Sequence, residues 1–268
     1  AFRNVHSLSK KNDFVDTSFQ EIHNGIRCRM YEPYDSLHMQ FSTKVRFNAK
    51  PDWYYNIEYT KEKSRGYEFK EDLYVPGTFE LNIKKGESII FSAGLEDAGN
   101  TRLNTLFEKE ISYRIPRNNF ANCLVNAAQQ FFVHHDGITE LIAGYHWFTV
   151  HGRDTFVALP GLTLPMGEHS TFFKVMDTMI RLQKGAFFPS SIRGKTREYS
   201  SVDTSLWFFW SLQQYIVFTG DAGTVWERYG KVMKNILEDY SKGSDHNIHM
   251  LDNGLLYAGN ENDTLTWM

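Results

Sequence analysis

Hydrophobic and polar residues alternate along short stretches of the first hundred positions, as they do in half-buried β-strands. The longest run covers residues 38–47, and its mainly apolar face consists of Met39, Phe41, Thr43, Val45 and Phe47. Shorter runs predict further strands at 25–31, 54–59, 79–83 and 88–93. Pro76-Gly77 and residues 84–86 predict turns. Several short strands separated by turns predict a β-sandwich.

From about residue 115 the apolar residues recur at helical spacing. Pro116 precedes a helical pattern that stops near residues 136–137. Further helices are predicted at 153–164, 168–183, 202–219 and 224–240. Gly220 is expected to end the helix at 202–219, and Asp221 to cap the next one. Because no strand-like alternation interrupts these segments, the second part is predicted to be α-helical, with functional residues on the loops.

Composition narrows the classes of function. The chain has 268 residues, and its 29 Lys and Arg against 32 Asp and Glu give a net charge of -3. No basic block of the kind that follows a phosphate backbone is present, so nucleic acid is not expected as a partner. No stretch reaches the roughly 18 apolar residues of a membrane span, and the N-terminus does not resemble a signal peptide. No membrane partner is therefore predicted.

The two cysteines, Cys28 and Cys123, lie far apart and have neither metal-type nor redox-type spacing. A reduced, cytoplasmic setting is the corresponding expectation. The chain also lacks an initiating Met, which suggests a fragment.

Aromatic residues make up 15% of the chain, and several stand beside polar residues. Tyr145, Trp147 and Phe148 precede Arg153 and Asp154 at the start of a predicted helix. The guanidinium donors and the carboxylate acceptors can hold vicinal hydroxyls of one sugar ring, and Trp147 can stack on its apolar face. The alternatives are a structural ion pair at the helix start and an indole that packs under its loop.

Two further segments carry carboxylates. Asp203 precedes an aromatic run in a predicted turn-to-helix junction, where it can accept a sugar hydroxyl or simply cap the helix. Most of that run, which includes Trp207, is expected in the core. Glu261 and Asp263 lie in a loop rich in Gly and Asn, where they can act as acid and base in glycoside hydrolysis or form solvated surface charge.

Metal and cofactor chemistry finds little support in the motifs. The run 134–136 and the pair His146 and His151 have no recognised ligand spacing. Gly-rich phosphate loops, dinucleotide fingerprints and nucleophile elbows are absent from the sequence. No metal and no cofactor are predicted.

At these residues the chain resembles the glycogen debranching family of the amylo-α-1,6-glucosidase type. In the first part the resemblance rests on residues 1–8, 51–54, 57–59, 65–66 and 69–73. In the second it rests on residues 147–148, 152–155, 159–162, 199, 201–207 and 265–268. It implies an α+β multidomain fold: residues 1–105 would form a β-sandwich portion of the N-terminal debranching-enzyme domain, and 106–268 the N-terminal part of an (α/α)6 glucosidase barrel.

The resemblance also implies a function. The complete protein would remove α-1,6-linked glucose stubs from glycogen or another branched α-glucan with inversion, in glycogen catabolism, without a cofactor. Arg153 and Asp154 would clamp the glucose at the non-reducing end. The same pocket would include Asp203, Tyr199 and Trp207, with two stacking walls, Trp147 and Trp267.

Two departures from the family pattern bear on this expectation. The residue before Gly152 is His151, preceded by Val150, where the family usually has Trp after a polar residue. The loss of an indole face puts in doubt whether the affinity for glucan or the preferred chain length follows the family. The family's general acid is an Asp expected just after Met268, and its general base lies further downstream. The chain is then a fragment that holds part of the pocket, without the catalytic carboxylates.

Two other functions remain open at the level of sequence. One is a non-catalytic glucan-binding module, and the other is a different (α/α)6 enzyme, glucoamylase-like or trehalase-like. The sequence does not indicate an oligomeric state. A partial barrel would expose apolar helix faces, so self-association is expected.

Overall fold

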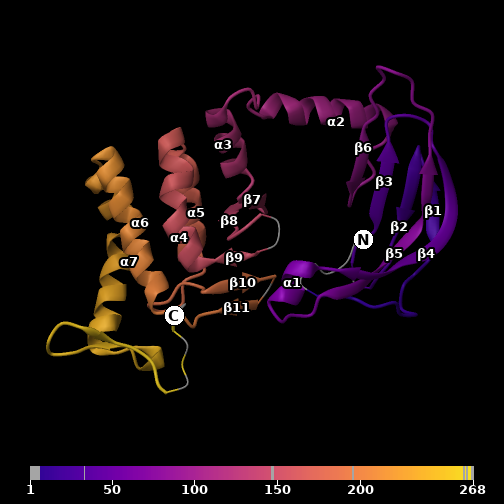
Figure 1. Cartoon of the computed structure of the whole chain (residues 1–268). Coiled ribbons are helices and arrows are strands. Elements are labelled where there is room, and N and C mark those ends of the chain that lie inside the picture. Colours follow the sequence, from indigo (N-terminus) through magenta and orange to yellow (C-terminus); the bar gives the residue numbers. More distant parts are fainter. Residues whose placement is uncertain are drawn as a thin grey trace. The chain divides into compact units, whose positions relative to one another are not determined.

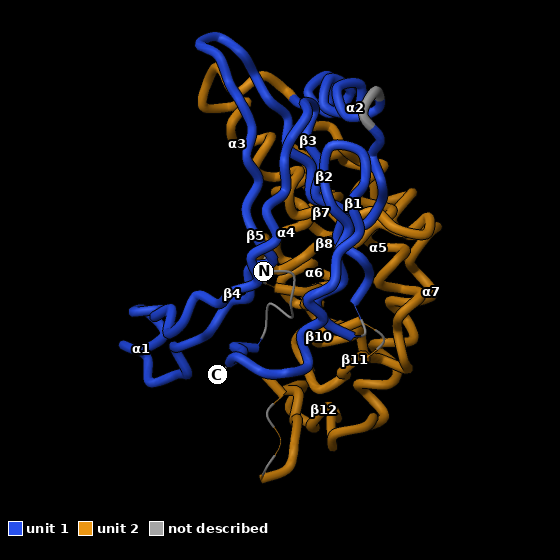
Figure 2. Tube along the Cα trace, turned by 90° about the vertical axis from the view of Figure 1, so that its right-hand side faces the viewer, with its two compact units in different colours: residues 1–114 blue, residues 115–268 orange. Residues whose placement is uncertain are grey.

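The computed structural model describes residues 7–32, 34–145, 148–194, 196–261, 263 and 265–266. The fold is mixed α and β, with several small sheets and, within the described residues, seven α-helices (Figure 1). The chain divides into two compact units, residues 1–114 and 115–268 (Figure 2). The predicted domain boundary at 105/106 falls inside a helix of the first unit. Each unit has a buried core of its own.

Two antiparallel sheets form the first unit. One has four strands in the order β1-β2-β3-β6, namely β1 (Phe19–Ile22), β2 (Gly25–Cys28), β3 (Leu37–Phe41) and β6 (Phe91–Gly94). The other is a long hairpin of β4 (Arg46–Glu58) and β5 (Lys70–Glu80), with α1 (Thr60–Ser64) at its end. Ile26 and Cys28 of the first sheet and Tyr74 of the hairpin share one buried core. The helix α2 (Asn100–Tyr113) follows.

The strand predicted at 38–47 is wrong in its extent, because the chain leaves the sheet between β3 and β4. Ser42 exchanges two hydrogen bonds with Ile90: its backbone N–H donates to the Ile90 carbonyl, and its hydroxyl accepts from the Ile90 N–H. The side chain thereby takes the place of a backbone acceptor, and the ladder ends. Side-chain alternation alone does not reveal such a break.

The turn predicted at Pro76-Gly77 is also wrong, since both residues lie inside β5. Ala49 pairs with Gly77 and Asp52 with Val75, so the register shifts at this point and Pro76 has no partner in it. Proline has no N–H to donate, and it therefore fits a strand where a bulge interrupts the ladder.

The five helices predicted in the second unit are present, but the first of them ends at Gln129 and not near residues 136–137, because a strand occupies residues 132–135. The ends of the other four helices differ from the prediction by one or two residues. The five helices are α3 (Phe120–Gln129), α4 (Gly152–Thr163), α5 (His169–Arg181), α6 (Asp203–Thr219) and α7 (Ala222–Lys242). Gly220 ends α6 in the left-handed conformation, with φ of 76°. The Asp221 carboxylate caps α7 by accepting from the Thr224 N–H. Both local predictions at this junction are therefore correct.

The expectation of a purely helical second part is wrong. Short strands lie between the helices: β7 (Phe132–His135), β8 (Ile138–Leu141), β9 (Val150–His151), β10 (Ser191–Arg193), β11 (Thr196–Glu198), β12 (His249–Met250) and β13 (Leu256–Tyr257). Two short 3-10 helices, η1 (Leu164–Met166) and η2 (Asp245–Asn247), complete the unit. Strands of two to four residues are too short for a period of two to be read from the sequence.

Helices α4 and α6 pack against each other, with the rings of Phe156 and Phe208 in contact at a centroid distance of 5.6 Å, while α5 and α7 each bury one face. On α6 the buried positions include Thr204, Ser205 and Ser211. The buried face of α5 follows helical spacing through Phe172, Val175, Met176 and Met179. Among the described residues, no helix is both long and apolar enough to cross a membrane.

Candidate functional site

A three-stranded sheet holds together the N-termini of α4 and α6. Its strand order is β11-β10-β9, and β9 runs directly into α4. The Gly152 N–H donates to the Ser190 carbonyl, and a Cβ at Gly152 would lie only 2.2 Å from the Pro189 carbonyl oxygen and 2.7 Å from Cγ2 of Thr204. The absence of a side chain at Gly152 thus allows the start of α4 to approach both this sheet and α6.

The next residue, Arg153, reaches across to α6. Its Nη1 lies 3.0 Å from Oδ2 of Asp203, and its guanidinium carbon lies 5.8 Å from the centroid of the Trp207 ring. Asp203 and Trp207 are four residues apart on α6 and therefore share one helix face. The side chains of Arg153 and Asp203 are 33% and 19% exposed. Arg153, Asp203 and Trp207, three residues predicted for one pocket, are thus brought together at a solvent-accessible position.

Asp203 is not the cap of α6, so the capping hypothesis for this residue is wrong. The N-cap is Val202, and it makes no side-chain cap hydrogen bond. The Asp203 carboxylate instead binds two other side chains. Its Oδ2 accepts a hydrogen bond from Arg153, and its Oδ1 accepts one from the Ser201 hydroxyl. Thr204 in turn donates to the Ser201 oxygen at 2.8 Å. Ser201 orients the carboxylate, a role that was not predicted, although its position two residues before an Asp is a local signal for it.

Asp154 has a different partner from Arg153. Its Oδ2 lies 3.4 Å from Nδ1 of His151. Arg153 and Asp154 therefore do not form an ion pair with each other, so the alternative of a structural ion pair between them is wrong. The Asp154 side chain, which is 41% exposed, also lines an apolar groove of ≈ 380 Å³.

The loop before Asp203 is fixed by residues that come much later in the chain. The Val202 N–H donates to the Leu265 carbonyl at 3.0 Å, and the Tyr240 hydroxyl donates to the Val202 carbonyl at 2.9 Å. Burial raises the pKa of Tyr240 to about 12, so its hydroxyl keeps its proton as a donor at neutral pH. The position of Asp203 thus depends on packing against the end of α7.

Of the remaining predicted pocket residues, the structure describes Tyr199 only. The Tyr199 hydroxyl donates to the Leu182 carbonyl at 2.8 Å, and its ring packs against the small core around Tyr240, so this hydroxyl is engaged in holding the loop. Trp147 and Trp267 lie outside the described residues, as does His146.

Two of the other polar candidates, Asp263 and His135, make hydrogen bonds to residues close by in the sequence. Asp263 accepts from both the backbone and the side chain of Asn260, which is a turn-stabilising arrangement, and Glu261 is exposed. His135 lies 2.9 Å from Glu140, whose hydrogen bond raises the pKa of the imidazole. Within the described ranges, no three His, Cys, Asp or Glu side chains converge as metal ligands do.

The site brings together hydrogen-bond donors, hydrogen-bond acceptors and an aromatic ring. An ion pair that is partly exposed stabilises a fold by about 1 kcal/mol or less, so a ligand can engage Arg153 and Asp203 at little cost to the stability of the fold. A guanidinium offers five N–H donors, and each carboxylate oxygen offers two lone pairs, so both groups can bind further partners. The indole of Trp207, half-buried beside them, adds an aromatic surface.

Two protein-family profiles match the chain. The family profile described as "Amylo-alpha-1,6-glucosidase" matches residues 126–268, which is more than half of the chain. The chain belongs to the amylo-α-1,6-glucosidase family. A second profile, described as "Glycogen debranching enzyme N terminal", matches residues 1–90. Comparison with individual curated proteins and with solved structures gives no match.

The family assignment covers both parts of the molecule that carry polar clusters. The amylo-α-1,6-glucosidase segment contains Arg153, Asp154, Asp203 and Trp207, the four residues at the N-termini of α4 and α6. The other matched segment contains the β4–β5 hairpin with α1. The family is one of glucan-processing hydrolases, and the chain matches its two profiles in separate segments.

Proposed function

We propose that the complete protein hydrolyses α-1,6-linked glucose stubs on glycogen-type glucans with inversion, and that this chain supplies part of the substrate pocket. The observation that carries the proposal is the position of Arg153 between the Asp203 carboxylate and the Trp207 ring. Charged donors, charged acceptors and an aromatic surface meet there, which is the combination that binds a pyranose ring.

In this proposal Arg153 and Asp154 bind the hydroxyls of the terminal glucose. Asp203 orients Arg153 and accepts a hydrogen bond from a sugar hydroxyl. Trp207 supports the guanidinium, and Trp147 and Trp267 form stacking walls. Tyr199 contributes by fixing the loop that precedes Asp203. Positioning of a reacting ring in this way is a major source of rate enhancement in enzymes.

The catalytic step requires two carboxyl groups on opposite faces of the sugar. One protonates the leaving oxygen, and the other activates a water molecule; in inverting enzymes they stand roughly 6.5 to 9.5 Å apart. We assign the general acid to an Asp that follows Met268 and the base to a later residue. No metal or cofactor has a step in this mechanism.

The same proposal extends to architecture and setting. We assign residues 1–105 to a β-sandwich portion, because two sheets share one core there. Residues 106–268 are assigned to the first part of an (α/α)6 barrel, because α4 and α6 pack together while α5 and α7 each bury a single face. A cytoplasmic setting, where glycogen is degraded, completes the proposal.

The test is glucose release from phosphorylase-limit glycogen by this chain and by a version extended through its native downstream sequence. We expect activity in the extended form. Within it, Asp203→Asn should lower kcat/KM about 10- to 100-fold, because the amide weakens a charge-assisted hydrogen bond to Arg153 and removes an acceptor for the sugar.

The matched control is Asp177→Asn. Asp177 also pairs with an arginine, Arg228, at 2.7 Å and accepts from the Tyr229 hydroxyl, but it connects α5 and α7. Its substitution should leave kcat/KM unchanged. An equal loss in both variants, or no activity in a folded extended protein, would refute the proposal; activity in the short form would return Glu261 and Asp263 to consideration.

A further inference from the structure

A second pocket lies in the first unit, at the end of the β4–β5 hairpin that carries α1. It has a volume of ≈ 620 Å³ and is open to solvent. Two segments that are far apart in sequence line it, and their residues are Leu8, Lys10, Gly66, Tyr67, Glu68, Phe69 and Lys70. None of these residues belongs to the site between α4 and α6.

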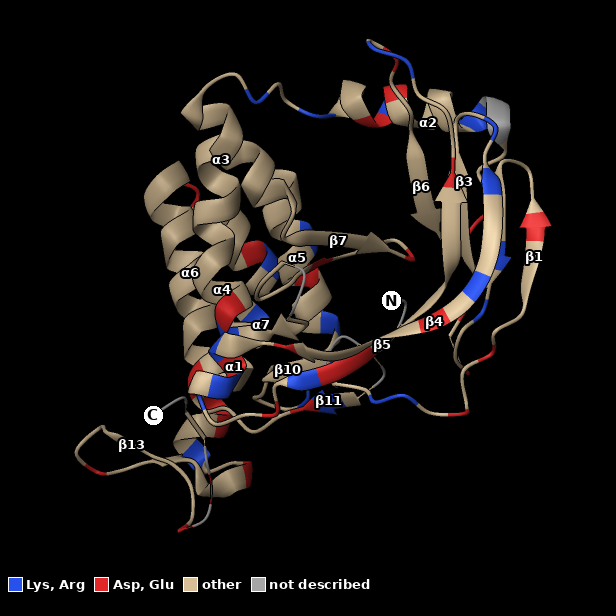
Figure 3. Ribbon diagram, turned by 45° about the vertical axis from the view of Figure 1, so that its right-hand side comes forward, with Lys and Arg blue, Asp and Glu red and all other residues tan. Residues whose placement is uncertain are grey.

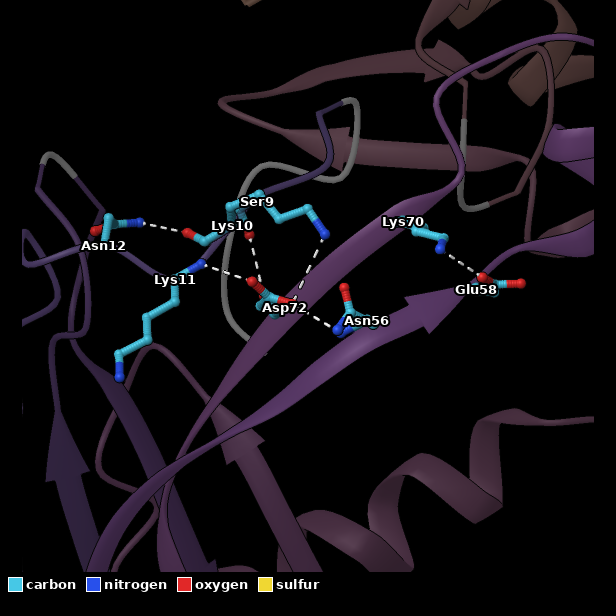
Figure 4. A network of polar contacts seen from close by, with 8 residues as sticks. All are labelled: Ser9, Lys10, Lys11, Asn12, Asn56, Glu58, Lys70 and Asp72. Carbon is cyan, nitrogen blue, oxygen red and sulfur yellow. Dashed lines mark hydrogen bonds and ion pairs between the residues drawn. The ribbon is translucent and has the colours of Figure 1, made fainter.

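The first wall is held in place by Asp72, whose side chain is nearly buried (Figure 4). Its two carboxylate oxygens accept the backbone N–H of Lys11 at 3.0 Å and that of Asn56 at 2.8 Å. The Asp72 N–H donates to the Ser9 carbonyl at 2.8 Å, and the Lys10 ammonium lies 3.8 Å from the carboxylate. The N-terminal segment is therefore fixed against β5, with Lys10 at the pocket.

The second wall follows from the way α1 ends. The Tyr67 N–H donates to the Glu62 carbonyl and the Gly66 N–H to the Lys63 carbonyl, which together form a Schellman motif. This motif needs a left-handed residue, and Gly66 supplies it with φ of 79°. The backbone of Tyr67 is thereby fixed directly after the helix, while its side chain remains 58% exposed.

Aromatic rings and charges of both signs meet at this pocket. The Arg65 guanidinium lies 5.0 Å from the Tyr67 ring centroid, and the Lys70 ammonium lies 5.6 Å from that of Phe69. Lys70 also pairs with Glu58 at 2.8 Å. Figure 3 shows acidic and basic residues interspersed along α1 and the start of β5. The charge is mixed, so the pocket does not favour an anion.

A neutral polyol matches this combination best. Ammonium groups donate to hydroxyl oxygens, the exposed Glu68 carboxylate accepts from hydroxyls, and the Tyr67 and Phe69 rings offer apolar surface to the C–H face of a pyranose. We propose that the Lys10, Tyr67, Glu68, Phe69 and Lys70 pocket is a second glucan-binding site, which holds an α-glucan chain independently of the α4–α6 site. The inference rests on the proposed function for the nature of the ligand.

The test is electrophoresis of the full chain through gels that contain glycogen, in a background that carries Arg153→Ala. This background removes the guanidinium of the α4–α6 site, so the remaining retardation reports the second site. Adding Tyr67→Ala should weaken glycogen binding about tenfold, as expected from the loss of an aromatic contact. Maltoheptaose should restore mobility, and inorganic phosphate should not.

The matched control is Tyr113→Ala in the same background. Tyr113 is 70% exposed on α2 and has the Lys109 ammonium 5.8 Å from its ring centroid, but it lines no part of the pocket. Its substitution should leave retardation unchanged. Equal binding by the Tyr67→Ala and Tyr113→Ala proteins, or competition by phosphate, would overturn the inference.

The two proposals fail in different ways in this assay. If Arg153→Ala alone abolishes retardation, the second site is refuted while the α4–α6 site is supported. If Arg153→Ala has no effect and Tyr67→Ala abolishes binding, the second site is supported and the α4–α6 assignment is weakened. A second variant, Gly66→Ala, should also weaken binding by straining the turn before Tyr67, whereas Gly86→Ala, with φ of 87°, should not.

Discussion

Gly152 is the residue whose size decides how closely α4 meets its neighbours. The Pro189 carbonyl and the Thr204 side chain occupy the space that a Cβ would need. The contact sets the distance between the helices that carry Arg153 and Asp203, so the hydrogen bond between these two residues depends on the same glycine.

Replacing Gly152 by Ala should destabilise the second unit. We expect the free energy of unfolding to fall by about 1–3 kcal/mol, because the overlap with backbone atoms forces a local shift. Urea denaturation followed by circular dichroism measures this change.

Gly161→Ala is the control on the same helix. A Cβ there has open space around it, and its φ is not left-handed, so the substitution should raise the free energy of unfolding by about 0.5–1 kcal/mol. A loss of stability of the same size in both variants would contradict the argument.

At the residue scale the sequence identifies most of the polar groups but not their partners. Arg153 and Asp203 were expected in one pocket, on the strength of a resemblance. Their direct contact could not be derived, because it depends on the packing of two helices fifty residues apart and on Ser201 turning the carboxylate sideways. The sugar-binding roles of all the pocket residues stay predictions, namely Trp147, Arg153, Asp154, Tyr199, Asp203, Trp207 and Trp267.

At the scale of elements, Asp72 joins the N-terminal segment to the β4–β5 hairpin. The N–H groups of Asn56 and then Lys11 donate to its ionised carboxylate and hold its pKa below the ordinary value of 3.8. A lowered pKa in the folded state means that ionised Asp72 stabilises the fold. The stabilisation is complete above pH 3.8 and is lost as the pH falls from there through the folded-state pKa.

Asp72→Asn should therefore lower Tm most at neutral pH, and the difference from the wild type should close as the pH falls below 3.8. Thermal denaturation at a series of pH values measures this difference. Asp35→Asn, which alters an exposed carboxylate, should give no comparable difference. A constant gap between the wild type and Asp72→Asn across the acid range would show that the role of the carboxylate charge is wrongly assigned.

Elements of different length were predictable to different degrees. The long helices of the second unit have several turns of apolar periodicity, so their positions were predicted closely. The strands β7 to β13 have two to four residues each, and their pairing depends on segments brought together by the helices. The hairpin β4–β5 was recognised only in pieces, since Pro76 and Gly77 imitate a turn where the structure has a bulge.

At the scale of the whole molecule, apolar side chains on α6 and α7 remain exposed. They include Val217, Phe218 and Trp226, and a groove of ≈ 630 Å³ runs between the two helices. Contiguous apolar surface of this kind promotes association in water.

We expect the chain to self-associate as its concentration rises, which sedimentation velocity would detect. Val217→Lys should shift the distribution towards the monomer, because it places a charge on the apolar face. Ile83→Lys, at an exposed position in the first unit, should not. A wild-type chain that sediments as a monomer at all concentrations would contradict this expectation.

The hydrogen bonds around Val202 also have a consequence for biosynthesis. A ribosome makes the chain from its N-terminus, so Asp203 leaves the exit tunnel well before Tyr240 and Leu265 do. Until those residues emerge, Val202 has neither the acceptor for its N–H nor the donor for its carbonyl that the native structure provides. We therefore expect the Asp203 carboxylate to reach its final position only after Tyr240 and Leu265 have been synthesised.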